Sequence, residues 1–397
     1  MTFVYHHRTA GRGGEGHHIM SVVHALEVRG HHVTIVSPPG IDPRRASDVA
    51  PLDKGSTRES GVRRLWKWLS VRAPQALFEL AEIAYNAYAL VAVRRALADR
   101  PGAAYYERYA FFLFAGVWWA RRKGHTVLLE VNEVVGIERA RHQLLVPVAR
   151  WLERQTFRRA SHIITVSTFL KDEIVRRGGA AATTHVFPNA IDPSRFTGPS
   201  GRARVRSALG LQDAVVVGFA GWFDAWDRLD VLIPAVAALR RAGRDIRILL
   251  VGDGPVAPTL RDLAARAGIS EFVTLTGRVP KSEMPAYIDA MDIAVLPDSN
   301  EFGSPMVLFE FMAMGKAIVA CDRGPIRDVL RTGQNGVIVT PADAVALKDA
   351  FARLIDDTGW MARLGCRARL DVMANHTWDA TARRTLELLE GAMSEVA

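Results

Sequence analysis

Residues 300–316 read NEFGSPMVLFEFMAMGK, an apolar run with polar groups at positions where they could bind an anion. Gly303, Ser304 and Pro305 come just before the run, and the carboxylate of Glu310 lies within it. Proline is favoured at the first position of a helix, where its missing N–H is not needed. The sequence therefore predicts a helix that begins at about Ser304–Pro305.

The predicted helix would present unpaired N–H groups of Met306, Val307 and Leu308 at its start, where the helix dipole adds partial positive charge. A helix start of this kind binds phosphate groups. Glu310 lies one turn further along, within reach of a ribose whose diphosphate occupies the helix start. The alternative is a structural ion pair between Glu310 and a neighbouring arginine.

A second candidate loop, TAGRGGEGHHIM, has four glycines between an expected first strand and a helix. Glycines allow backbone N–H groups to approach an anion at a helix start. The spacing is not that of the dinucleotide-binding fingerprint, and no acidic residue follows at the expected distance. A tight turn without a ligand is the alternative interpretation of Gly11, Gly13, Gly14 and Gly16.

Strand-like segments alternate with amphipathic helical segments such as Val231–Leu239, which is typical of parallel α/β sheets. The strand-like runs are HHVTIVS, HTVLLEV, SHIITVS, VVVGFAG, IRILLVG, FVTLTG, IAVLPD, KAIVAC and NGVIVT. A Pro-, Gly- and Ser-rich stretch at Phe187–Arg204 lacks an apolar period, so a linker between two doubly wound domains is predicted there. Ligands bind outside the carboxyl ends of such strands, and two facing domains would form a cleft.

The composition fits a soluble globular protein of more than one domain, with 397 residues, 49% of them hydrophobic and 23% charged. We find no N-terminal signal segment and no window of 18 uncharged apolar residues, so a spanning helix is not expected. The two cysteines, Cys321 and Cys366, fit a reducing compartment, and a cytoplasmic location is expected.

Positive charge is concentrated in the first half of the chain. Residues 1–195 contain 28 Lys and Arg against 17 Asp and Glu, a net charge of +11, whereas the remainder has 23 against 25, a net charge of −2. This excess indicates either solvated arginines or a half that meets an anionic lipid or an acidic acceptor. No zinc-ligand spacing or interleaved aromatic and basic motif indicates nucleic acid.

Together these segments resemble the retaining glycosyltransferases of family 4, which have the GT-B fold. The segment LPDSNEFGSPMVLFEFMAMGKAIVACDRGPIRDVLRTGQNGVIVTPAD is similar to the signature of the family, in which a short Glu-, Gly- and Phe-rich loop precedes LFEYMA and GKPIVA. GGEGHHI with GHHVTIVSPPG, YYERYAFFLFAGVWWARRKGHTVLLEVNE and VFPNAID resemble other segments of the family. The resemblance covers nearly the whole chain.

The resemblance implies an α/β GT-B fold of two doubly wound, Rossmann-like domains with a cleft between them. Residues 1–190 would bind the acceptor, residues 191–376 would bind the nucleotide-sugar, and residues 377–397 would form a helix that crosses back to the first domain. The implied reaction moves a sugar, with a UDP-sugar as the expected donor, to an acceptor hydroxyl with retention at the anomeric carbon. The product would be a polysaccharide, a glycolipid or a natural-product glycoside.

In the usual proposal for this family, the acceptor attacks on the same face and the leaving phosphate takes its proton. Stabilising the departing diphosphate is then the main catalytic work, and neither a metal nor another cofactor is expected. By resemblance, Glu310 binds the ribose hydroxyls of the donor, and Gly277 and Arg278 lie beside its base. The other donor-binding candidates are Gly13, Gly14, Phe302, Gly303, Ser304, Pro305, Met306 and Val307.

The resemblance also places Asn132 or Glu133 near the reacting centre, although VNEV replaces the usual VNAP. The basic pair that many members carry in the second domain is missing, because Trp222 and Asp227 stand there. We predict that Arg228 supplies the missing charge while Asp227 turns outward or pairs with it. A solvent-facing arginine is the alternative.

A second departure concerns the first of two glutamates that family members often carry eight positions apart. The residue eight positions before Glu310 is Phe302, and Glu301 is nine before it.

Two other features have competing interpretations. The His-His pairs at 6/7, 17/18 and 31/32 lie on separate elements without an acidic partner pattern, so no metal site is predicted. The segment 61–90 mixes Arg and Lys with Trp and Leu. It is either a buried helix or an interfacial helix for a lipid-linked acceptor.

Two functions compete with sugar transfer: a catalytically degenerate nucleotide-sugar-binding GT-B protein, and another GT-B enzyme such as a phosphorylase or epimerase. The expected partners are a nucleotide-sugar donor and an acceptor glycan, lipid-linked sugar or small-molecule aglycone. Peripheral contact with an anionic membrane at its inner face is expected, and nucleic acid is not.

Overall fold

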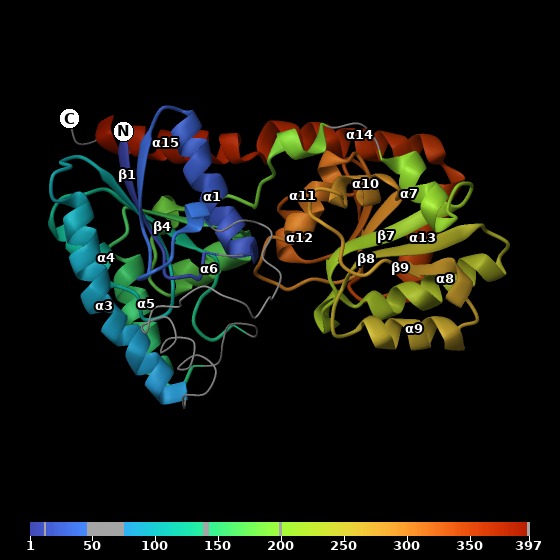
Figure 1. Cartoon of the computed structure of the whole chain (residues 1–397), viewed down its shortest axis with the longest axis horizontal. Coiled ribbons are helices and arrows are strands. Elements are labelled where there is room, and N and C mark those ends of the chain that lie inside the picture. Colours follow the sequence, from blue (N-terminus) through green and yellow to red (C-terminus); the bar gives the residue numbers. More distant parts are fainter. Residues whose placement is uncertain (12, 46–74, 138–142, 198–200, 395–397) are drawn as a thin grey trace. The chain divides into compact units, whose positions relative to one another are not determined.

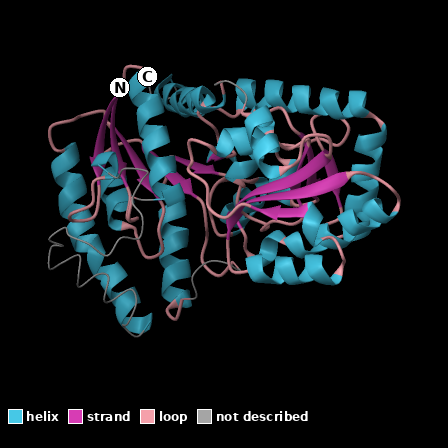
Figure 2. Ribbon diagram, turned by 45° about the vertical axis from the view of Figure 1, so that its right-hand side comes forward, coloured by secondary structure: helices cyan, strands magenta, loops and turns pink. Residues whose placement is uncertain are grey.

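The computed structural model describes residues 1–11, 13–45, 75–137, 143–197 and 201–394, which form two α/β units. Unit 1 comprises Met1–Phe187 and Thr381–Ala397, and unit 2 comprises Pro188–Ala380. The sequence predicted boundaries after residues 190 and 376, and the roles assigned to those domains stay predictions. In each unit, helices pack against a central sheet (Figure 2).

Unit 1 contains a parallel six-stranded sheet with the order β2-β1-β3-β4-β5-β6. Its strands are β1 (Thr2–His6), β2 (His32–Val36), β3 (Ala104–Arg108), β4 (Val127–Val131), β5 (His162–Thr165) and β6 (Thr184–Val186). Its helices include α1 (Gly13–Val28), α3 (Gln75–Leu97), α4 (Ala115–Arg122), α5 (Val146–Phe157) and α6 (Thr168–Arg176). Every residue of β4 is buried, as expected for a parallel strand covered on both faces.

Unit 2 repeats this architecture with the order β12-β11-β10-β7-β8-β9, also parallel (Figure 1). Its strands are β7 (Val215–Trp222), β8 (Ile246–Asp253), β9 (Val273–Leu275), β10 (Ile293–Leu296), β11 (Ala317–Cys321) and β12 (Val337–Val339). Its helices are α7 (Arg202–Leu209), α8 (Leu232–Arg241), α9 (Ala257–Arg266), α10 (Met284–Asp289), α11 (Met306–Ala313), α12 (Gly324–Arg327), α13 (Ala344–Asp356) and α14 (Thr358–Asn375).

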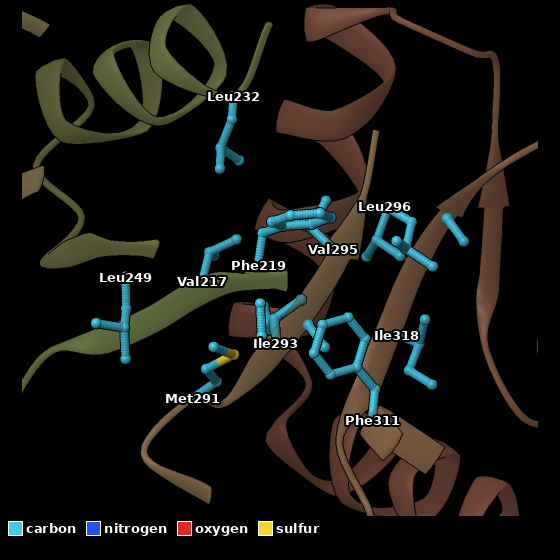
Figure 3. Packing of buried hydrophobic residues seen from close by; sticks show 14 of the residues in the cluster. Val217, Phe219, Leu232, Leu249, Met291, Ile293, Val295, Leu296, Phe311 and Ile318 are labelled. Atoms are coloured by element: carbon cyan, nitrogen blue, oxygen red, sulfur yellow. The ribbon is translucent and has the colours of Figure 1, made fainter. Parts of the chain in front are cut away.

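The core of unit 2 joins its sheet to α11, the helix predicted from the segment 300–316. Phe311 of α11 packs among strand residues that include Ile293 and Ile318 (Figure 3). Phe309 and Phe311 are fully buried. Burial of this apolar helix fixes its position, so the residues at its start are held at the carboxyl end of the sheet.

The strand order reverses between β1 and β3 in unit 1 and between β7 and β10 in unit 2. In doubly wound sheets, the loops after the strands on either side of such a reversal form the ligand site. The loops after β7 and β10 contain Arg228 and the start of α11. The sheet topology therefore brings the two halves of the predicted diphosphate site to one place.

The helix α15 (Trp378–Ser394) begins in unit 2 and continues in unit 1 from Thr381 onward. In unit 1, the Arg384 guanidinium lies 5.0 Å from the centre of the Phe187 ring. Part of the predicted linker is regular, because residues Pro193–Phe196 form a 3-10 helix and α7 begins at Arg202.

Candidate functional site

The start of α11 differs in detail from the prediction. Pro305 is the residue before the helix, with extended backbone angles φ −70° and ψ 118°, and Met306 is the first helical residue. The N–H of Leu308 is not free, because it donates to the carbonyl oxygen of Pro305 at 3.1 Å. Among the described residues, the N–H groups of Met306 and Val307 have no acceptor, so they remain available to a ligand.

Two asparagine side chains shape the loop before α11. The Oδ1 of Asn300 accepts from the N–H groups of Phe302, at 3.1 Å, and of Gly303. A Cβ at Gly303 would lie 2.9 Å from this oxygen, so a larger residue would disturb the turn. Asn189 donates from its N–H to Ser304 Oγ at 3.1 Å and from its side chain to the Ser304 carbonyl oxygen at 2.6 Å.

Among the described residues, Glu310 does not form the structural ion pair that was the alternative interpretation. It is half-buried, and no described residue forms a salt bridge with it. Burial raises the pKa of the Glu310 carboxyl group, and the charges of Arg195 and Lys281 partly offset this effect. A carboxylate kept near two cations without a direct partner can accept hydrogen bonds from ligand hydroxyls.

Arg323, which follows β11, forms ion pairs with two residues of the loop after β10. Its guanidinium donates to both carboxylate oxygens of Asp298, at 2.9 and 3.1 Å, and to Glu301 at 2.7 Å. Glu301, the residue nine positions before Glu310, is therefore a partner of Arg323. The N–H of Asp298 donates to the carbonyl oxygen of Asp227 at 3.3 Å, which links this loop to the loop after β7.

The loop after β7 places Arg228 in an unusual backbone conformation. Arg228 has φ 48° and ψ 42°, the left-handed region that favours glycine. Its guanidinium donates to both oxygens of Asp230, at 2.9 and 3.0 Å. The Asp227 carboxylate accepts from the N–H of Asp224 at 2.9 Å, so it caps its own loop.

The predicted base-binding edge lies where β8 and β9 end. Gly277 accepts a hydrogen bond from the N–H of Gly252 at 3.0 Å. The Arg278 guanidinium lies 5.1 Å from the centre of the Trp222 ring and 3.8 Å from Asp253. Trp222 is 51% exposed, so an aromatic surface stands beside the two residues assigned to the base.

In unit 1, one buried carboxylate organises the corresponding end of the sheet. Glu130 of β4 accepts from His18 at 2.9 Å, from Asn132 at 2.7 Å and from Arg108. Its second oxygen accepts from the Tyr106 hydroxyl at 2.9 Å. Burial raises the pKa of Glu130, but His18 and Arg108 outweigh it and hold this pKa well below its ordinary value.

This network brings the predicted residues of unit 1 together. His18 lies on α1, whose first residues are Gly13 and Gly14, and Asn132 follows β4. Among the described residues, a Cβ added at Gly13 or Gly14 would meet no atom within 4 Å, so these residues leave space at the helix start. Glu133 follows Asn132 and is half-buried.

The expectation that the histidine pairs lack acidic partners is wrong for two of them. His6 of β1 lies 2.8 Å from Glu107 of the neighbouring strand β3, and His18 of α1 lies 2.9 Å from Glu130 of β4. Burial lowers the pKa of His7 to about 4, with help from His6 and Arg108, so its imidazole is neutral at pH 7. Within the described residues, no group of three or more His, Cys, Asp or Glu side chains could hold a metal ion.

Several residues of these sites were not identified from the sequence. Asn189 and Arg195 lie in and after the motif VFPNAID, which was noted only as a family segment. Arg323 lies in CDRGP, inside the signature segment. His18 was considered only as part of a histidine pair, and Glu130 carried no signal beyond a charge inside an apolar strand.

Family models match both units of the chain. A model described as glycosyl transferase 4-like domain matches residues 13–190, and one described as glycosyl transferases group 1 matches residues 214–357. Each match therefore contains one of the two clusters described above. The first includes Gly13, His18 and Glu130, and the second includes Arg228 and Glu310.

Curated relatives include the alpha-D-kanosaminyltransferase of Streptomyces kanamyceticus, 30% identical over 53% of this chain and 55% of the relative. Another is the GDP-mannose-dependent alpha-(1-6)-phosphatidylinositol monomannoside mannosyltransferase of Mycolicibacterium smegmatis, 30% identical over 62% of this chain and 66% of the relative. The matches thus span between about half and two thirds of the length of these relatives.

Among solved structures, HepE of Anabaena, determined with UDP, superposes with a TM-score of 0.71 at 17% identity, over 98% of this chain and 100% of that chain. The two parallel six-stranded sheets and this superposition define a GT-B protein. With the two family models, they show that the chain belongs to the GT4-type glycosyltransferases. The resemblance found in the sequence is therefore confirmed.

Proposed function

We propose that this protein transfers a sugar from a nucleotide-sugar donor to an acceptor hydroxyl, with retention at the anomeric carbon. One observation carries the proposal most directly. The start of α11, at the point where the strand order of unit 2 reverses, presents the available N–H groups of Met306 and Val307 one turn before Glu310. Backbone donors at a helix start suit a diphosphate, and a carboxylate one turn on suits a ribose.

In the proposed step, the acceptor oxygen forms a bond to the anomeric carbon while the bond from that carbon to the diphosphate oxygen breaks. The acceptor proton passes to the departing diphosphate, so atoms and charge balance without a protein nucleophile. The protein then contributes mainly preorganised positive charge and hydrogen-bond donors for the diphosphate. We propose that no metal or other cofactor takes part.

Three cationic side chains are candidates to offset the diphosphate charge. Arg228 is already paired with Asp230, yet its side chain is 42% exposed at the end of β7. The charges of Arg195 and Lys281 lower the pKa of Glu310, so both cations lie near this carboxyl group. We propose that Arg228 exchanges Asp230 for the diphosphate when the donor binds, and that Arg195 and Lys281 add to the positive field.

We propose that unit 1 binds the acceptor. The Oδ1 of Asn132 is buried without a hydrogen-bond partner among the described residues, while its amide is fixed by Glu130. An amide oxygen held in place in this way can accept from an acceptor hydroxyl. Gly13 and Gly14 leave the start of α1 open to the donor phosphate and sugar, as proposed for this pair.

The donor and acceptor classes rest on the relatives. A UDP-sugar remains our proposed donor, since the HepE structure contains UDP, although the mycolicibacterial relative is named as GDP-mannose-dependent. The acceptor is proposed to be a glycan, a lipid-linked sugar or a small-molecule aglycone, the last in line with the kanosaminyltransferase. We propose a cytoplasmic location, and no role for nucleic acid.

The test begins with a thermal-shift screen of UDP, GDP and their sugars, because a ligand that binds only the folded state raises the melting temperature. The stabilising donor is then incubated with the protein and a panel of acceptors, and release of the nucleoside diphosphate is measured. Transfer or donor hydrolysis that is lost in Glu310→Ala supports the proposal. Stabilisation by no nucleotide would contradict it.

One observation favours a second candidate, a nucleotide-sugar-binding protein without turnover. Arg228 and Arg323 are both paired with carboxylates, and the basic pair common in the family is missing. Tight donor binding in calorimetry without hydrolysis or transfer would favour this candidate. A phosphorylase would instead require inorganic phosphate.

A further inference from the structure

Three polar residues of α3, Glu79, Glu82 and Asn86, point inward. Glu79 accepts from the N–H groups of Leu144 and Leu145 at 2.6 and 2.8 Å. Glu82 pairs with Arg8, and Asn86 accepts from the N–H groups that begin α4. These three residues are buried, so their hydrogen bonds attach α3 to the loops of unit 1.

The opposite face of α3 is apolar and exposed. Leu77, Leu80, Tyr88 and Val91 are 50, 53, 38 and 46% exposed, and their spacing places them on one stripe. A surface helix ordinarily has the reverse arrangement, with its apolar stripe toward the core. The described residues of unit 1 leave this apolar stripe exposed.

A second apolar stripe runs along the start of α5. Leu144, Val148 and Trp151 are 53, 42 and 55% exposed. The helix α4 contacts both α3 and α5. Asn86 of α3 accepts from the N–H groups that begin α4, and the Trp151 ring of α5 lies against Trp118 of α4 with centroids 6.1 Å apart. We call the seven exposed side chains the α3–α5 face: Leu77, Leu80, Tyr88, Val91, Leu144, Val148 and Trp151.

The charges exposed on these helices all have one sign. The acidic residues of α3, α4 and α5 are Glu79, Glu82 and Glu153, and all three are buried. The exposed charged residues on the same helices are Arg94, Arg95, Arg121, Arg122, Arg150 and Arg154. Among the described residues of these three helices, the exposed charge is therefore positive only, and exposed apolar side chains together with positive charge complement an anionic lipid surface.

We propose that unit 1 docks onto an anionic lipid bilayer through the α3–α5 face, with α3 lying in the interface. By length and composition alone, α3 could span a membrane. Its buried Glu79, Glu82 and Asn86, however, are bonded to unit 1, and a spanning helix would have to release them. A second copy of the chain complements the face poorly, because it would bring the same arginines against each other.

The test is co-sedimentation of the full chain with vesicles of phosphatidylcholine alone or with phosphatidylglycerol. We expect at least about tenfold stronger binding to the anionic vesicles, and a marked loss at high salt, which screens exposed charges. Indifference to both vesicle types would overturn the proposal. No donor or acceptor is needed, so this outcome is independent of the proposed sugar transfer.

Two double variants locate the binding surface. Leu80→Glu with Trp151→Glu should weaken binding at least about tenfold, because charge replaces apolar side chains that enter the interface. The matched control is Val345→Glu with Leu370→Glu in unit 2, whose side chains are 63 and 60% exposed. The control should bind as the wild type does. Equal loss in both variants would overturn the assignment of the face.

A second pair of variants tests charge. Arg94→Glu with Arg95→Glu should weaken binding and reduce its salt dependence, whereas Arg261→Glu with Arg266→Glu on α9 should change neither. Sedimentation velocity of each variant completes the test. Two results together would overturn the lipid assignment and show that a second copy covers the face. The wild type would form a dimer without binding vesicles, and the double variant Leu80→Glu with Trp151→Glu would be a monomer.

Discussion

Asn189 holds Ser304 with two hydrogen bonds, one from its backbone N–H and one from its side-chain amide, at 3.1 and 2.6 Å. Ser304 is 7% exposed, so its hydroxyl and carbonyl are both fixed inside unit 2. The segment predicted as a linker therefore positions the loop before α11. The two hydrogen bonds fix the position of Ser304, two residues before the first helical residue Met306.

Asn189→Ala should remove the amide donor and keep the backbone donor. The Ser304 carbonyl then loses a hydrogen bond, which typically costs about 1 kcal/mol of folding free energy. If the loop binds the diphosphate, donor affinity should fall by about fivefold, the equivalent of that energy. Calorimetry with the stabilising nucleotide measures this change. Thr197→Ala, in the same segment, is the control, and equal affinity in both variants would contradict the role of Asn189.

Glu310→Ala should weaken donor binding far more than it changes the fold. Removal of a charged hydrogen-bond partner of the ribose should cost on the order of 2–3 kcal/mol of binding free energy. Glu301→Ala removes an exposed carboxylate that pairs with Arg323 and serves as the control. Unchanged donor affinity in Glu310→Ala would end the ribose assignment.

In the protein without a bound donor, ionisation of Glu310 should lower the free energy of unfolding. Because burial raises the pKa of this carboxyl group, the folded state holds its proton to a higher pH than the unfolded state does. Its contribution to stability therefore falls as pH rises above the ordinary carboxyl pKa. We expect Glu310→Gln to gain melting temperature relative to the wild type between pH 4.5 and pH 7. A constant difference across this range would contradict the prediction.

Glu130→Gln should destabilise unit 1 strongly. The change leaves Arg108 and His18 without their buried carboxylate, a loss that typically costs roughly 3–5 kcal/mol. The folded-state pKa of Glu130 is lowered, so its stabilisation is present above the ordinary carboxyl pKa and declines as pH falls. Urea denaturation measures the free energy of unfolding of the wild type and of Glu130→Gln. The difference between the two proteins should be smaller at pH 3.5 than at pH 7. Glu133→Gln is the neighbouring control.

Three substitutions at Arg228 distinguish the effect of its charge on activity from the effect of its left-handed backbone conformation on stability. Arg228→Ala should lower kcat/KM by about 100-fold, as loss of one preorganised stabiliser of transition-state charge typically does. Arg228→Lys should restore part of this, because a point charge lacks the fork that matches phosphate. Arg228→Gly should be equally inactive but more stable than Arg228→Ala, by on the order of 1 kcal/mol, because glycine adopts the left-handed conformation without strain.

Full activity of Arg228→Ala would show that the charge comes from elsewhere. Lys281→Ala and Arg195→Ala would then be compared, since both side chains act on Glu310.

Much of the fold followed from hydrophobic pattern. All nine strand-like runs named from the sequence contain strands, because buried parallel strands need continuous runs such as VLLEV. The third and sixth strands of unit 1 were harder to identify, since β3 contains Tyr, Glu and Arg and β6 has only three residues. Residues 61–74 of the predicted basic and aromatic segment lie outside the described residues.

The local part of the site could be predicted, and the contacts between distant segments could not. The order Gly-Ser-Pro before an apolar helix indicates a helix start within a few residues. Nothing in the sequence says that Asn189 reaches Ser304, 115 positions away, or that His18 reaches Glu130. Such partners depend on which strands become neighbours in the sheet. The assigned functions of Asn132, Glu133 and the other candidates stay predictions.

The division of α15 between the units has a consequence for synthesis on the ribosome. Leu386 and Leu389, 8 and 3% exposed, are part of unit 1, but the chain produces them only after the whole of unit 2. The first unit to emerge is therefore the last to be completed. The apolar surface of unit 1 that α15 contacts stays exposed to solvent while roughly 190 further residues are translated, at about 5–20 residues per second. A nascent chain stalled before Thr381 should expose this surface to chaperones.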